Sequence, residues 1–149
     1  MAQNDIKETL STTEQTSVMK AIFDIINSNQ DIDGELNFEA LNVDGSSYGV
    51  FSKSGAVYLS KDILGGFKGA VPFTLQYRSQ PKKDSGRIKM IDNLNKLSEW
   101  LTKTDYPSMT QGRIIEKIEA VTVPYLYNVE ESGSITYAVE FNLEYRKEA

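Results

Sequence analysis

Apolar and polar residues alternate most regularly near the end of the chain. Over residues 135–146 the odd positions are apolar or aromatic, and the even positions are polar or small. A period of two is typical of a β-strand with one dry and one wet face. Residues 113–127 are rich in β-branched residues and alternate loosely until Pro124, and residues 131–134 read as a turn between the two runs. We therefore predict a long C-terminal β-hairpin.

Two other stretches carry apolar residues at helical spacing, which predicts helices over residues 12–28 and 85–103. Ser11 and Glu14 have the capping-box spacing of a helix start. The first apolar stripe consists of Val18, Ile22, Ile25 and Ile26, widened by Met19, Ala21 and Phe23. The second consists of Ile88, Ile91, Leu94, Leu97 and Leu101, bordered by Met90 and Trp100.

The region between the two helices is predicted to be rich in β-structure. Apolar and polar residues alternate strictly over residues 73–78, which indicates a strand over 70–79. Residues 48–51 and 56–59 flank the turn-like 52–55, a pattern that predicts a hairpin. Residues 36–41 also alternate, and Asp44-Gly45 is a strong turn signal.

Together these elements predict an α+β fold, with a mostly antiparallel sheet and both amphipathic helices on one face. Neither helix could bury its apolar stripe otherwise. The chain has 149 residues, without repeats or low-complexity runs, and suits a single domain over residues 1–149. We expect residues 1–10 to form a flexible N-terminal arm.

The composition then excludes several classes of reaction and of binding site. The sequence contains no cysteine and no histidine, which excludes disulfides, Ser-His-Asp and Cys-His triads, and zinc sites built on these ligands. The formal net charge is −5, whereas nucleic-acid binders carry a basic face. Lys82 and Lys83 are adjacent, and we interpret them as a solvated loop and not as a phosphate-binding patch. No apolar run is long enough to span a membrane, and the first residues do not resemble a signal peptide.

Two short motifs suggest ligand sites, and both fit poorly. Gly65, Gly66 and Gly69 match neither phosphate-binding motif, and a strand follows them where those motifs need a helix. We interpret them as a flexible loop entering a strand, with Pro72 near the strand start or at an edge. Residues 31–35 read Asp-Ile-Asp-Gly-Glu, but glycine comes too early for a calcium-binding EF-hand loop. A turn from helix to strand fits better, and we expect no cofactor or metal.

Two kinds of side chain remain as candidates for a functional site: paired carboxylates and tyrosines. Glu116 with Glu119, and Glu140 with Glu144, lie on predicted strands, and nothing near either pair indicates the pocket that a catalytic carboxylate needs. Glu140 and Glu144 share the polar face of the last strand, where we expect solvent to surround them. We expect one set of tyrosines to face the core: Tyr77, Tyr137 and Tyr145. A second set lies in or beside loops and is a better candidate for subunit contacts, because tyrosine is favoured at interfaces: Tyr106, Tyr125 and Tyr127.

Several motifs resemble those of one protein family. The stretch 70–78 reads AVPFTLQYR, the second helix contains LNKLSEWL over 94–101, TVPYL stands at 122–126, and YAVEFNLEY closes the chain over 137–145. From about residue 15 to 147 the sequence resembles the minor capsid, or tail-terminator, proteins of long-tailed phages and prophages of Gram-positive bacteria. The likeness consists of element order and strand motifs, without a catalytic signature.

The resemblance implies a structural virion protein that acts by self-assembly into a hexameric ring. Its implied partners are copies of itself, the tail-tube protein and the head connector or head-completion protein, with DNA passing through without specific binding. It implies no reaction, no cofactor and no membrane, and a location at the head–tail junction. As interface candidates we keep Tyr106, Tyr125, Tyr127, Arg78, Lys82 and Lys83. The alternatives are another head–tail joining protein, or a small ligand-binding or enzymatic domain that uses carboxylates and tyrosines.

Overall fold

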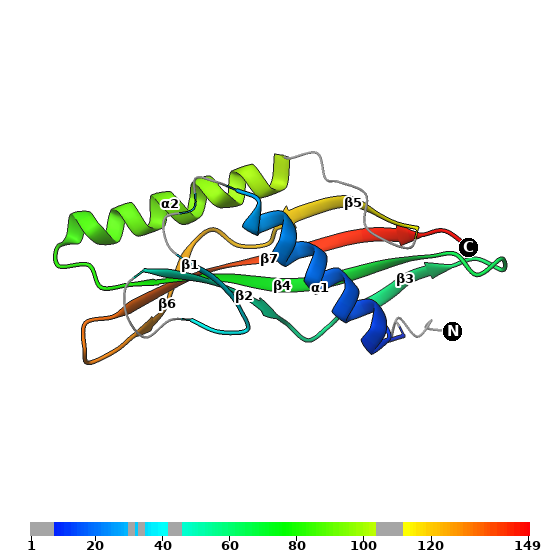
Figure 1. The fold of residues 1–149 in the computed structure, drawn as a ribbon, viewed down its shortest axis with the longest axis horizontal. Coiled ribbons are helices and arrows are strands. Elements are labelled where there is room, and N and C mark those ends of the chain that lie inside the picture. The colour runs from blue at the N-terminus through cyan, green and yellow to red at the C-terminus, as the bar shows by residue number, and fades with distance from the viewer. Residues whose placement is uncertain (1–7, 30–31, 33–34, 42–45, 104–111) are drawn as a thin grey trace, which may run out of the picture.

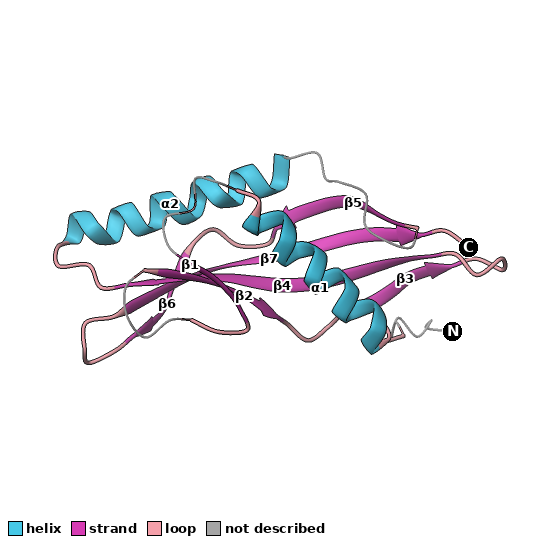
Figure 2. Cartoon of the chain, in the orientation of Figure 1, coloured by secondary structure: helices cyan, strands magenta, loops and turns pink. Residues whose placement is uncertain are grey.

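A computed structural model describes residues 8–29, 32, 35–41, 46–103 and 112–149. One seven-stranded sheet carries both helices on a single face (Figures 1 and 2), as the sequence predicts. The helices are α1 (Thr12–Asn27) and α2 (Asp84–Lys103). The strands are β1 (Glu35–Phe38), β2 (Ser47–Ser52), β3 (Val57–Lys61), β4 (Phe67–Ser79), β5 (Arg113–Ala120), β6 (Tyr125–Val129) and β7 (Ile135–Lys147).

Two long central strands organise the sheet. β4 and β7 have 13 residues each and pair antiparallel along their whole length, from Phe67 opposite Lys147 to Ser79 opposite Ile135. Shorter strands cover their outer edges in two pieces, with β2 and β3 along β4, and β5 and β6 along β7. β1 adds to β2 in a parallel pair at the border of the sheet.

The predicted hairpin of residues 48–51 and 56–59 is wrong. β2 and β3 both run antiparallel to β4, on successive halves of the same edge, and they do not pair with each other. The long β4 explains this, because a six-residue β2 leaves half of the edge uncovered and its backbone groups without partners. Gly55, with φ +108°, lies in the short link that lets the chain continue along this edge.

Pro72 lies on β4 where the pairing with β2 ends and the pairing with β3 begins. It lies inside β4 and neither at the strand start nor in an edge strand, which corrects the expectation from the sequence. β2 pairs with β4 up to Phe73, and β3 pairs from Ala70. Pro72 therefore stands opposite the gap between them, where a missing N–H breaks no ladder bond. β4 also begins at Phe67, earlier than predicted, so Gly69 belongs to the strand.

The predicted strand over 113–127 is likewise broken into β5 and β6. β5 ends opposite Phe141 and β6 starts opposite Ala138, and in the link between them Val121 N still donates to Glu140 O at 2.7 Å. Pro124 in this link cannot donate a ladder hydrogen bond. The predicted turn at 131–134 is confirmed, and Gly133 adopts φ +94° within it.

The core lies between the sheet and the two helices. α1 contributes Val18, Met19, Ile22, Ile25 and Ile26, while α2 contributes Met90, Leu94, Leu97 and Leu101. Tyr77, Tyr137 and Tyr145 face this core, as predicted, with Tyr77 stacked on Tyr48 at 4.2 Å between ring centroids. Ile88 does not: its side chain is 62% exposed, so the buried stripe of α2 runs through Met90 instead.

The opposite surface of the sheet, here called the outer face, carries the polar residues of β4 and β7. Over Glu140–Arg146 buried and half-buried residues alternate, so this part has the predicted dry and wet faces. Thr136 and Ala138, however, are buried although they belong to the outer face. Leu41 and Tyr127 line the hollow over Thr136, which explains why this half of the outer face is sheltered.

Residues 8–10 differ from the flexible arm expected over 1–10. Thr9 forms an antiparallel bridge with Val57, and the side chain of Leu10 is 1% exposed. Backbone hydrogen bonds join Leu10 N to Ala56 O at 3.0 Å and Tyr58 N to Glu8 O at 2.9 Å. These residues thus extend the sheet border, and the rest of the predicted arm lies outside the described residues. So does the predicted Asp44-Gly45 turn.

Candidate functional site

Two of the residues singled out from the sequence meet on the outer face. Arg78 from the end of β4 and Tyr127 from β6 line one hollow of about 300 Å³, together with Gln76, Glu130 and Thr136. The guanidinium of Arg78 donates from Nε to Glu130 Oε2 at 2.8 Å, and Gln80 Nε2 donates to Ser132 O at 2.7 Å. Both bonds tie the β6–β7 turn to the end of β4, so Arg78 fixes the position of β6.

Tyr125 is engaged within the chain. Its hydroxyl donates to Glu140 Oε2 at 3.0 Å, and Glu140 also forms an ion pair with Lys53. The Lys53 ammonium, followed by this hydroxyl, lowers the pKa of Glu140. Burial and then the nearby carboxylate raise the pKa of Tyr125. This trio joins the link after β2 to β7 and β6.

The remaining interface candidates lie elsewhere. Lys82 and Lys83 are exposed in the link before α2, away from the hollow that Arg78 lines. Tyr106 falls outside the described residues. The structure therefore brings together Arg78 and Tyr127 of the six, with Tyr125 on the same strand as Tyr127.

The carboxylate pairs weighed for acid–base chemistry have cationic partners. Glu116 lies 3.5 Å from both Lys68 Nζ and Arg146 Nε. Glu144 lies 3.6 Å from Lys117 Nζ, whose pKa is raised chiefly by a hydrogen bond to Glu119. These contacts form a surface network of positively and negatively charged side chains on β4, β5 and β7. A carboxylate held by a neighbouring cation in solvent is a poor general acid, because its charged form is favoured.

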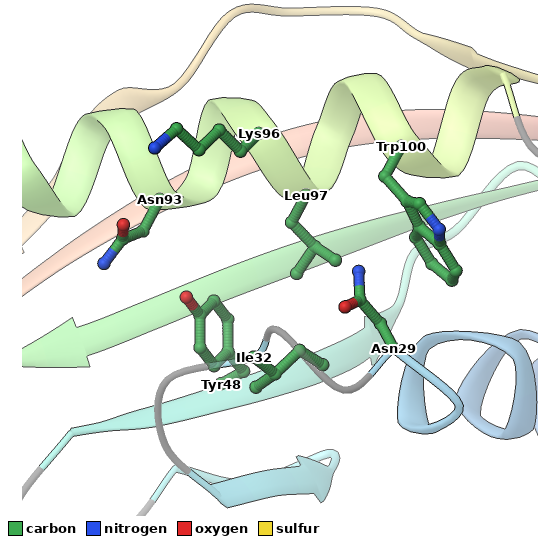
Figure 3. Close-up of a pocket in the computed structure, with 7 residues that line it drawn as sticks. All are labelled: Asn29, Ile32, Tyr48, Asn93, Lys96, Leu97 and Trp100. Carbon is green, nitrogen blue, oxygen red and sulfur yellow. The ribbon is translucent and has the colours of Figure 1, made fainter.

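A small pocket opens between α2 and the end of α1 (Figure 3). It has a volume of about 140 Å³, and its described lining contributes one cation, Lys96, and the phenol of Tyr48. Leu97, Trp100 and Ile32 supply apolar walls, and amides of Asn29 and Asn93 complete it. Among these described lining residues there is no carboxylate to pair with the lysine. Within the described part of the chain, no three acidic side chains gather to hold a metal ion.

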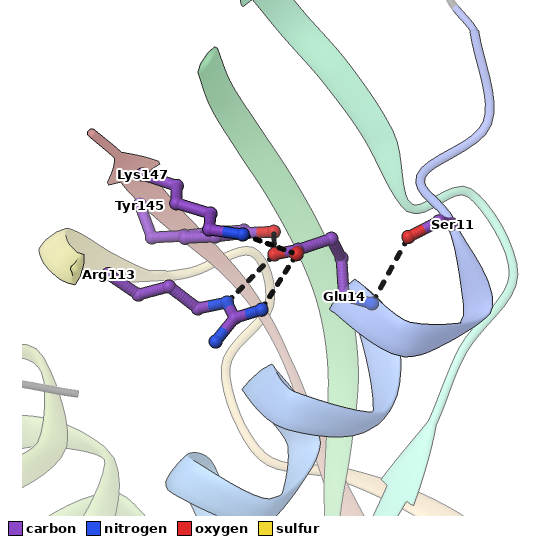
Figure 4. A network of polar contacts seen from close by, with 5 residues as sticks. All are labelled: Ser11, Glu14, Arg113, Tyr145 and Lys147. Carbon is purple, nitrogen blue, oxygen red and sulfur yellow. Dashed lines mark hydrogen bonds and ion pairs between the residues drawn. The ribbon is translucent and has the colours of Figure 1, made fainter. Parts of the chain in front are cut away.

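The most deeply buried charges form a structural cluster that the sequence did not reveal (Figure 4). Arg113, 2% exposed, donates from Nε and Nη2 to the two carboxylate oxygens of Glu14 at 2.8 and 2.7 Å. Tyr145 donates its hydroxyl to Glu14 Oε1 at 2.8 Å, and Lys147 Nζ lies 3.7 Å from Oε2. The helix start predicted at Ser11 is confirmed, since its hydroxyl accepts from Glu14 N at 3.2 Å.

The Glu14 carboxylate thus binds side chains of β5 and β7, while its backbone N–H serves the helix start. Its hydrogen bond from Arg113, followed by that from Tyr145, lowers the pKa of Glu14 against the opposing effect of burial. Burial and the hydrogen bond to Glu14 raise the pKa of Tyr145. The cluster locks α1 onto β5 and β7. Only the capping-box spacing marked Glu14 in the sequence, and nothing marked Arg113.

Exposed apolar side chains concentrate on β6 and the link that precedes it. Nine large apolar residues of the described chain are exposed, and five of them lie between residues 121 and 129: Val121, Val123, Leu126, Tyr127 and Val129. β6 pairs with β7 alone, so its other edge borders no strand of the described sheet. An apolar strand with a free edge is a surface for pairing with another chain.

Comparisons with known proteins show a shared fold. No family model and no curated protein matches the sequence. Among solved structures, a chain of the "Virion of native gene transfer agent (GTA) particle" superposes with a TM-score of 0.67 at 10% identity. The match covers 91% of this chain and 99% of that chain. The two chains therefore have the same fold over nearly their whole length. None of the described helices is long and apolar enough to cross a membrane.

Proposed function

We propose that this protein is a structural component of a phage-type virion, and that it acts as a tail terminator at the head–tail junction. The observation that carries the proposal is the structural match to a virion chain over 91% of this chain and 99% of the other. A match that covers nearly all of both chains is expected when the two chains correspond to each other as subunits. The sequence motifs that resemble tail terminators point in the same direction.

In this role copies of the chain form a ring, proposed to be hexameric, that caps the tail tube and presents a surface to the head connector. A ring needs heterologous contacts, in which one surface of each copy meets a different surface of the next. The free apolar edge of β6 supports such a role, since apolar patches on soluble proteins commonly mark interaction sites. The tail-tube protein and the connector are the other proposed partners.

The proposal assigns no reaction to the chain. What supports this is the state of the candidate acid–base groups, because Glu116, Glu140 and Glu144 each have a cationic partner on the outer face. We further propose that DNA passes the ring without specific binding. The net charge of −5 favours passage, since an acidic surface does not hold phosphates.

Electron microscopy of particles assembled with and without this protein tests the proposal. Tail terminators stop tube growth, so we expect tails of uncontrolled length, without heads, when the gene is deleted, and restored tails when it is supplied again. Headless tails of normal length would instead assign the chain to another head–tail joining step. Virions of normal form and number in its absence would overturn the structural role.

A further inference from the structure

The hollow on the outer face has a floor of buried, neutral polar side chains. Gln76 of β4 is 8% exposed, and Thr136 of β7 is 3% exposed. Neither side chain has a hydrogen-bonding partner among the described residues. In that part of the chain, Asn37 Nδ2 is the one fully enclosed side-chain nitrogen or oxygen without a partner, so the polar atoms of Gln76 and Thr136 open into the hollow. Because buried polar groups in proteins are normally paired, these two side chains are placed to bond a ligand.

Small neighbours keep the space above Gln76 open. In the ladder Gln76 stands opposite Gly49 of β2 and Ala138 of β7, which carry no side chain and a methyl group. Leu41 lies over Gly49, since a Cβ built there would be 3.1 Å from Leu41 Cδ2. It forms the wall on the β2 side, while Tyr127, 58% exposed, lines the β6 side. The hollow is therefore a short trough, with β4 and β7 as its floor and an apolar wall along each side.

The described lining of the trough carries no net charge. It contains one cation and one anion, Arg78 and Glu130, and these pair with each other at 2.8 Å between Nε and Oε2. A charged ligand would lose its water there without an opposite charge free to receive it. The other polar groups of the lining are neutral and both donate and accept hydrogen bonds: Gln76, Asn128 and Thr136. The trough thus suits a neutral ligand that has donors and acceptors of its own.

We propose that the trough binds an uncharged, extended peptide segment through its main chain. Each peptide unit has one N–H and one C=O, which match the carboxamides of Gln76 and Asn128. Side chains leave an extended chain at right angles to these groups, so they meet the walls of Leu41 and Tyr127 when the main chain faces the floor. A volume of about 300 Å³ admits a short extended segment and not a folded element. The inference rests on the proposed function, in which the segment belongs to a neighbouring subunit of the particle.

Photocross-linking in assembled particles identifies the occupant of the trough. The probe is the aromatic residue benzoylphenylalanine in place of Tyr127, and mass spectrometry identifies the peptide attached after irradiation. We expect one defined segment of a virion subunit, without charged residues at the point of attachment. The matched control carries the same probe in place of Ile88, which is 62% exposed on α2. A yield at 127 no higher than at 88 would overturn the proposal, and so would attachment to a charged segment.

A second measurement uses the isolated protein and the neutral peptide N-acetyl-Gly-Ser-Gly-Ser-amide. In nitrogen–proton NMR spectra we expect the signals of Gln76, Asn128 and Thr136 to shift saturably with this peptide and to stay in place with sodium acetate. The double variant Q76L/T136V replaces the floor by apolar groups of similar shape, so the fold should be retained while binding weakens at least about tenfold. The control N93L removes a carboxamide from the pocket beside α2 and should bind as wild type does.

The outcomes separate this site from the proposed function. Equal binding by folded Q76L/T136V, or shifts with methyl glucoside in place of the peptide, would show that the trough does not read a peptide main chain. If tails need the protein but the probe at 127 attaches to nothing, the site is wrong and the function stands. If the peptide binds through Gln76 and Thr136 but tails are normal without the protein, the peptide site stands and the tail-terminator role is wrong.

Discussion

At the scale of single residues, the cluster around Glu14 contributes most to the specific packing of this fold. A carboxylate at the start of α1 receives three hydrogen bonds from residues of the last strands, including two from Arg113, 99 positions away. Removing one partner of a buried ion pair is costly, since the other charge stays out of water. The cluster therefore makes the docking of α1 depend on protonation.

We predict that Glu14→Gln destabilises the protein by about 3–5 kcal/mol at neutral pH. Because the folded-state pKa of Glu14 is lowered, its stabilisation is complete above the ordinary value of 4.5 and is lost as pH falls through the folded-state pKa. The difference between wild type and variant should therefore shrink below pH 4.5. Urea unfolding from neutral to acidic pH measures it.

Glu99→Gln, on the exposed side of α2, is the control for that experiment. It should change stability by less than about 0.5 kcal/mol at neutral pH. A Glu14→Gln penalty that stays constant into the acid range would show that the carboxylate charge does not provide the stabilisation.

At the scale of elements, the structure decides which stripe of each helix is buried and which strand edges are covered. For α2, both Ile88 and Leu94 fit the helical spacing of the sequence, yet Leu94 is fully buried and Ile88 is 62% exposed. Ile88 lies on the side of α2 that faces away from the core, since Met90, only two residues later, is 3% exposed. The edges of β4 and β7 are covered by paired short strands, with prolines near or in the links.

Leu94→Ala should destabilise the protein by about 2–5 kcal/mol, because it leaves a cavity beneath α2. Ile88→Ala removes a similar volume from the surface and should cost less than about 0.5 kcal/mol. Thermal unfolding followed by circular dichroism compares the two. Equal losses would mean that the buried stripe of α2 has been assigned incorrectly.

At the scale of the whole molecule, one core joins both helices to the sheet. Both helices and the strands β2, β4, β5 and β7 contribute fully buried side chains to that core. A chain with one core is expected to unfold in one step. That residues 1–149 form a single domain remains a prediction from the sequence.

Cooperative unfolding can be checked with two probes. The sequence has one tryptophan, Trp100 on α2, while far-ultraviolet circular dichroism follows the helices and sheet together. We expect the two urea transitions to coincide within error, since α2 cannot leave the core alone. Tryptophan fluorescence that changes at clearly lower urea would show that α2 opens as a separate unit.

The sequence predicted the elements better than their arrangement. Helices over 12–28 and 85–103 and the strand over 135–146 were close to the observed bounds, because periodicity is a local property of the chain. Two of the interface candidates, Arg78 and Tyr127, line the same hollow. The alternation of apolar and polar residues along each strand could not show that these two residues meet. Leu126 lies within the strand predicted over 113–127, whereas Val129 lies outside it. The sequence also cannot distinguish a covered strand edge from an exposed one.

The amino-acid sequence by itself determined the α+β class, the placement of both helices on one face, and the absence of thiol and imidazole chemistry. The tertiary structure alone decided that β2 and β3 share an edge and that Arg113 meets Glu14. It also decided that β6 stays uncovered at one end while Ile63 and Leu64 project at the other. Pairing and exposure depend on residues far apart in the chain, which local periodicity does not encode.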